Sequence, residues 1–246
     1  MLIYSHRGVP DDLCPENSLL AFERARLAGV DGIETDVRLT RDHVPVLFHD
    51  PLTPSGVPLT NLTHRELVDD VGYEVPTLKS ALEVPWTRLR WNIELKTKAA
   101  VEPALAIIKK HMRERHIFVS SVSYGAVEKF IRYPDLTCGL VLRDRDDVFN
   151  IVFRRPGSLA AVDILVWNFT ALDPELLVRA DRQGYRHYVY GMTTVEEHRL
   201  CMELGADAVI TDFPERAFEA TGRVRGVDSD APVGDDLAEP RLGVAL

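Results

Sequence analysis

The sequence predicts an α/β fold in which eight parallel strands close into a (β/α)8 barrel. Its 246 residues suit one barrel-sized domain. Short apolar runs alternate with helical segments along the chain, which is typical of a parallel sheet. The composition, 46% hydrophobic and 27% charged, is that of an ordinary globular protein with enough apolar residues for a full core.

Nine short apolar runs are predicted strands, one more than the barrel needs. They are Leu2–Ser5, Gly32–Val37, Val44–His49, Trp91–Leu95, Ile117–Ser120, Gly139–Leu142, Asp163–Trp167, His187–Tyr190 and Ala208–Thr211. Only about six residues join Val37 to Val44, and a parallel crossover needs roughly ten or more. The second and third runs are therefore predicted to form a hairpin, which leaves eight barrel strands.

The hairpin is predicted to turn at Arg41-Asp42, which would place Glu34 opposite His49 on the same face. Pro45 would lie on the outer arm, where its missing N–H breaks no hydrogen bond of the sheet.

Helices are predicted between most of these strands. They are Asn17–Ala28, Val101–Arg113, Ser123–Arg132, Pro174–Gln183, Val195–Leu204 and Pro214–Ala220. Gly29 would end the first helix, Ser123 would be the N-cap of the third, and Pro174 suits a first turn. A catalytic domain is thus expected over residues 1–220, with an insertion of about 51–84 after the hairpin and a flexible tail over 221–246.

Composition also limits the partners and the location. A net charge of -9 makes nucleic acid an unsuitable partner. No run approaches the roughly 20 apolar residues that span a bilayer, and no leader is visible, so we expect a cytoplasmic protein without membrane insertion. Three cysteines are too few and too odd in number for a disulfide framework, which favours a reducing compartment.

Ionisable side chains gather where the predicted strands end, and the carboxyl ends of barrel strands form the catalytic face. Glu34 and Asp36 lie two apart and share a face, and Glu94 ends a neighbouring strand. Three carboxylates at one mouth would repel each other unless a cation neutralises them. Oxygen ligands favour a hard ion, so we predict one divalent cation, Mg²⁺ or Ca²⁺; the alternative is that these carboxylates are paired with arginines.

His6 and His49 also follow apolar strands, and two histidines can supply a base and an acid near neutral pH. Taken alone, a histidine in such a place is more often a hydrogen-bonded structural residue. Arg7 could clamp a phosphate and Lys96 could add a second positive charge. Simple ion pairs with Glu34 or Glu94 are the alternative for both.

The order of motifs resembles the glycerophosphodiester phosphodiesterases from about Leu2 to Pro214. The matching segments are His6-Arg7-Gly8, Pro15 to Ser18, Glu34 to Val37, Thr40 to Pro51, Glu94-Leu95-Lys96 and Gly205 to Asp212. The resemblance implies a TIM barrel with a small insertion that hydrolyses glycerophosphodiesters to an alcohol and glycerol 3-phosphate. It implies that His6 and His49 are the acid/base pair. It further implies metal ligands at Glu34, Asp36 and Glu94, and phosphate contacts at Arg7 and Lys96.

Two segments depart from the family pattern. Ser121 is followed by Val122 where many members have Ser-Phe, and Tyr190 to Thr193 replaces a Trp-Thr-Val-Asn stretch. Tyr190 could still form an aromatic wall for the substrate. Two other functions stay open: a lysophospholipase D or sphingomyelinase D-like lipid phosphodiesterase, and a catalytically silent module that binds glycerophosphodiesters. The sequence leaves the head group and the oligomeric state open.

Overall fold

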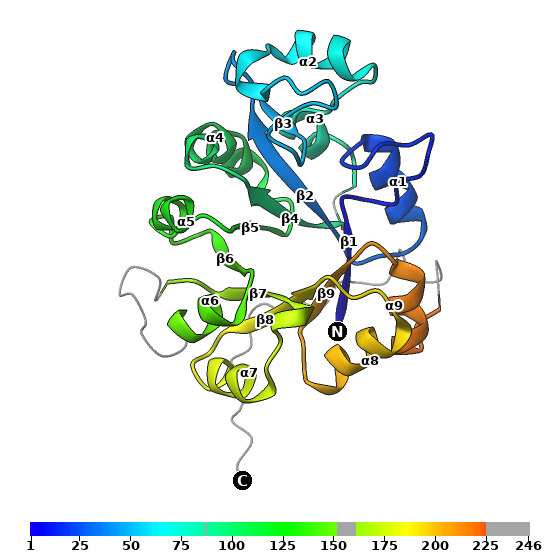
Figure 1. The fold of residues 1–246 in the computed structure, drawn as a ribbon, viewed down its shortest axis with the longest axis vertical. Coiled ribbons are helices and arrows are strands. Elements are labelled where there is room, and N and C mark those ends of the chain that lie inside the picture. The colour runs from blue at the N-terminus through cyan, green and yellow to red at the C-terminus, as the bar shows by residue number, and fades with distance from the viewer. Residues whose placement is uncertain (87, 152–160, 225–246) are drawn as a thin grey trace.

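The computed structural model describes residues 1–86, 88–151 and 161–224, and its centre is a closed barrel of eight parallel strands (Figure 1). The strands are β1 (Leu2–His6), β2 (Gly32–Leu39), β4 (Arg90–Leu95), β5 (Ile117–Ser121), β6 (Thr137–Leu142), β7 (Ile164–Asn168), β8 (Arg186–Tyr190) and β9 (Ala208–Thr211). The sheet order is β1-β9-β8-β7-β6-β5-β4-β2, and pairing of β1 with β2 closes the ring. The predicted (β/α)8 barrel is confirmed, and every predicted strand lies within two residues of an observed one.

A helix follows each barrel strand or, after β2, the hairpin excursion. These helices are α1 (Leu19–Leu27), α3 (Leu78–Leu82), α4 (Val101–His111), α5 (Tyr124–Phe130), α6 (Arg145–Phe149), α7 (Pro174–Asp181), α8 (Val195–Glu203) and α9 (Pro214–Thr221). The six predicted helices are confirmed, although the Ser123 side chain makes no capping hydrogen bond. Helices α3 and α6 were not predicted, since five residues carry little periodic signal, and neither was the extra helix α2 (His64–Val71), which lies in the segment expected to be an insertion. Within the described residues, no helix has the length and apolar character needed to cross a bilayer.

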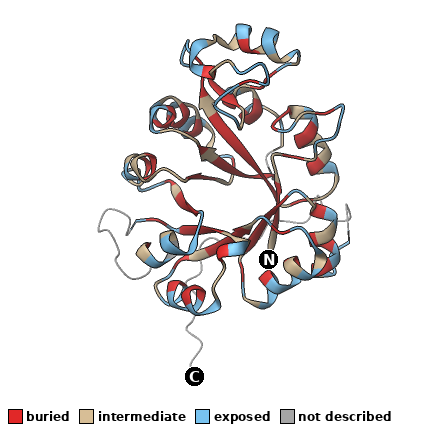
Figure 2. Ribbon diagram, viewed as in Figure 1, coloured by how far each residue is buried: buried red, intermediate tan, exposed pale blue. Residues whose placement is uncertain are grey.

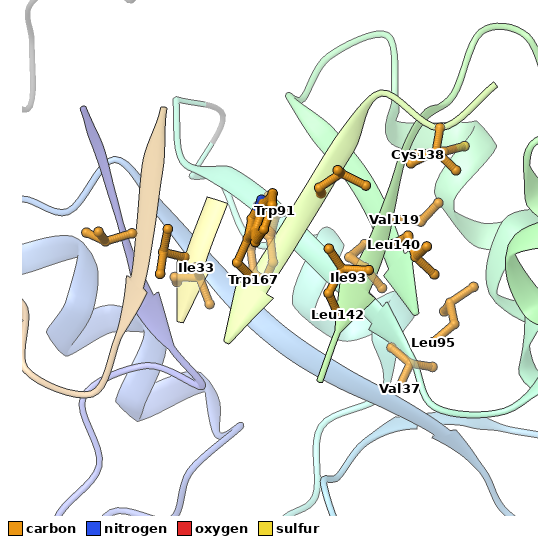
Figure 3. Packing of buried hydrophobic residues seen from close by; sticks show 14 of the residues in the cluster. Ile33, Val37, Trp91, Ile93, Leu95, Val119, Cys138, Leu140, Leu142 and Trp167 are labelled. Atoms are coloured by element: carbon orange, nitrogen blue, oxygen red, sulfur yellow. The ribbon is translucent and has the colours of Figure 1, made fainter. Parts of the chain in front are cut away.

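Alternation along the strands divides the core into an outer and an inner layer. Outward side chains such as Ile33, Trp91 and Trp167 pack under the helices (Figure 3). Inward side chains such as Tyr4 and Tyr188 fill the barrel itself. The strands are therefore buried on both faces, and the helices are buried on one side only (Figure 2).

Gly32 leaves room for the aromatic ring of Tyr4, which packs inside the barrel. A Cβ atom at this position would lie 2.4 Å from Cε1 of Tyr4. The Tyr4 ring also contacts Tyr188 and Phe118, with ring centroids 5.6 and 6.0 Å away. A residue with a side chain at position 32 would have to displace this packed ring.

The hairpin arm β3 (Pro45–Leu47) pairs with β2, as predicted, but in a register one residue away from the prediction. Val37 faces Leu47, so Glu34 does not lie opposite His49. The turn has three central residues instead of two, because His43 adopts a left-handed conformation (φ 60) while the Thr40 N–H bonds to the Val44 carbonyl. The prediction assumed a two-residue turn.

The excursion after β3 carries a small apolar cluster of its own, formed by Val46, Leu59, Leu67 and Val75. The 3-10 helix η1 (Leu59–Asn61) and α2 belong to it, and α2 begins with a capping box. By contrast, α3 contributes to the main core and so covers the barrel wall. Apart from residues 221–224, the predicted flexible tail lies outside the described residues.

Candidate active site

The register of the first barrel strands brings the predicted site residues together at one mouth. His6 ends β1 and pairs with Glu34 of β2, and Asp36, two residues further along, pairs with Glu94 of β4. Alternating residues share a face, so these side chains all lie on the inner side of the wall. They lie level with the carboxyl ends of β1 and β4, at the end of the barrel where barrel enzymes carry their catalytic groups.

Three carboxylates form the centre of this mouth. Glu34, Asp36 and Glu94 each offer an oxygen, and these oxygens lie within 4.8 Å of one another. Glu34 is only 2% exposed, and neither of its carboxylate oxygens has a hydrogen-bond partner among the described residues. Its burial, together with the charge of Asp36, raises the pKa of Glu34 to about 8. A buried carboxylate with two unused oxygens is the arrangement that a cation would satisfy.

Two cations flank Asp36. The Lys96 ammonium lies 2.7 Å from one oxygen of Asp36 and 2.8 Å from Glu94. Arg7 Nε lies 2.9 Å from the other oxygen of Asp36, while Arg7 Nη1 reaches Glu16 at 3.0 Å. Burial alone would raise the pKa of Asp36, but Lys96 and Arg7 outweigh it, so this pKa is lowered and the group stays ionised. Lys96 thus forms the ion pair with Glu94 that was the alternative for it, whereas Arg7 pairs with Asp36 and Glu16 and with neither Glu34 nor Glu94.

His6 is held between two carboxylates. Its Nδ1 lies 2.7 Å from Oδ1 of Asp212, the residue after β9, and its Nε2 lies 3.7 Å from Glu34. Burial lowers the pKa of His6, but the bond to Asp212 and the charge of Glu34 outweigh it, so the net pKa is raised. A carboxylate on Nδ1 fixes the ring orientation and leaves Nε2 facing the carboxylate cluster.

His49 reaches the same edge from the hairpin. The Phe48 N–H donates to the Asp36 carbonyl at 3.0 Å, which places the next residue beside the end of β2. Arg38 Nε donates to the His49 carbonyl at 2.6 Å, and Nδ1 of His49 lies 2.8 Å from Asp50. Both histidines therefore have a carboxylate on Nδ1.

Tyr190 ends β8 on the far side of the mouth and packs against the inner cluster of the barrel. Burial raises the pKa of the Tyr190 phenol, and Glu94 contributes through its charge. Tyr190 lies two residues after the inward-facing Tyr188, so its side chain is on the inner face at the carboxyl end of β8.

Two residues that the sequence analysis left without a role, Asn17 and Asp212, bind the predicted site residues. Asn17 Oδ1 accepts from the Thr35 hydroxyl and the Asp36 N–H, and Nδ2 donates to the Asp36 carboxylate at 3.1 Å. Both lie in motifs that carried the family resemblance. For Asp212, its position directly after a strand was the signal that could have assigned it to the mouth.

The oxygen-only donor set suits a hard divalent cation rather than zinc or another soft metal. Comparison with known families adds independent evidence. The model of the glycerophosphoryl diester phosphodiesterase family matches residues 6–216. The chain belongs to this family. It is therefore a phosphodiesterase, and its carboxylate cluster could bind the divalent metal on which the family depends.

Individual relatives agree with the family model. A probable glycerophosphodiester phosphodiesterase 2 of Mycobacterium tuberculosis is 29% identical over 89% of this chain and 75% of that protein. The crystal structure of a glycerophosphodiester phosphodiesterase from Thermotoga maritima is similar with a TM-score of 0.77 and 26% identity, covering 90% of this chain and 98% of that one. A phosphodiesterase from Oleispira antarctica, solved with its product sn-glycerol-3-phosphate, matches with a TM-score of 0.77 at 21% identity, covering 90% and 97%.

Proposed function

We propose that this phosphodiesterase hydrolyses glycerophosphodiesters to an alcohol and glycerol 3-phosphate, with His6 and His49 moving protons beside a divalent cation, Mg²⁺ or Ca²⁺. The observation that carries the proposal is the buried Glu34 carboxylate, whose two oxygens have no hydrogen-bond partner among the described residues. Glu34, Asp36 and Glu94 would hold the cation. When bound, it would neutralise charge that develops on the phosphate oxygens.

The two histidines supply the proton transfers. One accepts a proton from the nucleophile, and the other donates one to the oxygen of the leaving alcohol. Asp212 and Asp50 orient the two rings through their Nδ1 atoms. Because the pair works in opposite protonation states, the rate should follow a bell-shaped curve against pH.

Arg7, Lys96 and Tyr190 are proposed to contact the substrate. Arg7 and Lys96 would exchange their ion pairs with Asp36 for contacts to the anionic phosphate once a cation neutralises that carboxylate. Tyr190 would border the alcohol half of the substrate. The product bound to the Oleispira antarctica enzyme supports a small-molecule substrate of this type.

The test is release of glycerol 3-phosphate from glycerophosphocholine and glycerophosphoethanolamine. Activity should vanish with chelator and return with Mg²⁺ or Ca²⁺, and His6→Ala and Glu34→Ala should each lose about 10²-fold or more. His111→Ala, at the end of α4, is the matched control and should keep wild-type activity. A folded protein that releases no glycerol 3-phosphate with any metal contradicts the proposed substrate. Turnover of a lysolipid instead would favour a lipid phosphodiesterase, and no turnover of either would favour a binding module.

A further inference from the structure

The amino-terminal end of the barrel, opposite the proposed active site, holds a cavity that the reaction does not use. Arg90, Arg186, Tyr4 and Tyr188 contribute to its lining, together with His116 and Thr137. Arg90 begins β4 and Arg186 begins β8, whereas the active-site carboxylates lie level with the carboxyl ends of β1 and β4. The cavity is partly open to solvent and is far smaller than a pocket for a drug-sized molecule, so it suits only a small ligand.

Both arginines occupy inward positions of the wall. In β4, Trp91 and Ile93 belong to the outer core, so Arg90 points to the inside. In β8, Tyr188 belongs to the inner cluster, and Arg186 is two residues before it on the same face. The two guanidinium groups therefore enter the same end of the barrel.

This end of the barrel carries positive charge without a direct counter-charge. Arg90 is only 5% exposed. Among residues 1–86, 88–151 and 161–224, neither Arg90 nor Arg186 has a carboxylate within ion-pair distance. A buried charge is costly unless it is paired. An anion entering the cavity would supply the missing partner.

The carboxylates at this end are engaged elsewhere. Asp31, Asp163 and Asp207 each precede a strand and accept the backbone N–H of a residue in the neighbouring strand, respectively Ile3, Cys138 and His187. Asp31 also pairs with Arg223. Each of these aspartates lies an odd number of residues from the inward-facing residues of its strand, so its side chain is on the outer face of the barrel wall. They stabilise the strand ends and leave the cavity cationic.

We propose that the amino-terminal mouth of the barrel binds a small tetrahedral oxyanion, of which inorganic phosphate is the simplest example. Two planar guanidinium groups offer the paired N–H donors that match an oxyanion better than a halide. Burial raises the pKa of both Tyr4 and Tyr188, so their hydroxyls stay protonated; they hydrogen-bond to each other, which leaves one O–H to donate to an anion. This site is separate from the carboxylate cluster and does not depend on the proposed reaction.

Thermal unfolding of the full chain tests the site, with about 10 mM phosphate compared against chloride at equal ionic strength. Phosphate should raise the midpoint of the wild-type protein. Arg186→Gln should lose that shift while keeping glycerophosphocholine hydrolysis within twofold. Arg199→Gln, which removes an exposed arginine on α8, should keep both. Arg186→Gln is preferred to Arg90→Gln because Arg186 is half-buried and Arg90 is buried. The fold should therefore tolerate the substitution better at position 186.

A second arm separates this mouth from the active site, which would also attract phosphate. If the shift survives in Arg186→Gln and disappears in Lys96→Gln, phosphate binds at the active site and the proposal is overturned. Crystals soaked in about 5 mM selenate should give an anomalous peak between Arg90 and Arg186. A peak there with bromide but none with selenate would exclude an oxyanion site.

Discussion

Asp212 holds Nδ1 of His6, and this contact raises the pKa of the histidine against the effect of its burial. Asp212→Asn keeps the shape but removes the charge, so the pKa of His6 should fall. Whichever limb of the pH–rate profile belongs to His6 should move to lower pH, and kcat/KM should fall about 10²-fold. Asp50→Asn, the matched change beside His49, should leave that limb in place. An unmoved profile in Asp212→Asn would show that Asp212 does not act through His6.

Asn17 ties the loop after β1 to β2 through bonds to Thr35 and Asp36, and it does so in a left-handed conformation (φ 58). Asn17→Ala removes three buried hydrogen bonds and should lower the free energy of unfolding by about 3 kcal/mol in urea titrations. Asn17→Gly loses the same bonds but adopts this φ freely, so it should be about 1 kcal/mol more stable than the alanine variant. Equal stabilities would mean that the backbone is not strained here.

At the scale of elements, the contact between β2 and Tyr4 depends on the missing side chain of Gly32. Gly32→Ala places a methyl group 2.4 Å from the Tyr4 ring and should cost about 1–3 kcal/mol of stability. Gly125→Ala is the matched control, because a Cβ there meets only Lys98 Cδ at 3.4 Å and lies within α5. It should be neutral or slightly stabilising. Differential scanning calorimetry of both variants checks the contrast.

The strands were predictable because each is an apolar run bounded by polar residues, and their number followed from one short connection. The hairpin register could not be predicted, because it depends on the left-handed conformation of His43, which no local pattern indicates. The mouth residues were predictable from their places at strand ends. The roles of Asn17 and Asp212 were not, because they depend on contacts across 19 and 206 positions of the chain.

For the whole molecule, the raised pKa of Glu34 links stability to pH and to metal. The folded chain keeps a proton on Glu34 up to about pH 8, whereas the unfolded chain loses it near 4.5. The folded state therefore binds more protons in this window, and Glu34 makes the metal-free protein less stable as pH rises from about 4.5 to 8. Mg²⁺ or Ca²⁺ should raise the unfolding midpoint more at pH 8 than at pH 6, and its binding at pH 7 should release a proton.

Calorimetric metal titrations in buffers of different ionisation enthalpy measure that proton release. Glu34→Gln has no such proton, so its metal-free stability should fall less than that of the wild-type protein as pH rises through the same window. Metal binding that releases no proton from the wild-type protein would place the cation away from Glu34.

The closure of the ring by β1 and β9 has a consequence for synthesis of the chain. The His6–Asp212 pair joins positions 206 residues apart, so the ribosome must release nearly the whole barrel before these partners can meet. Strand β1 emerges first and cannot pair with β9 until the end of synthesis, whereas β2 and its hairpin arm β3 can pair locally. A nascent chain therefore carries the carboxylates of β2 and β4 long before His6 meets its orienting partner Asp212, and the proposed hydrolysis should begin only when the barrel is complete.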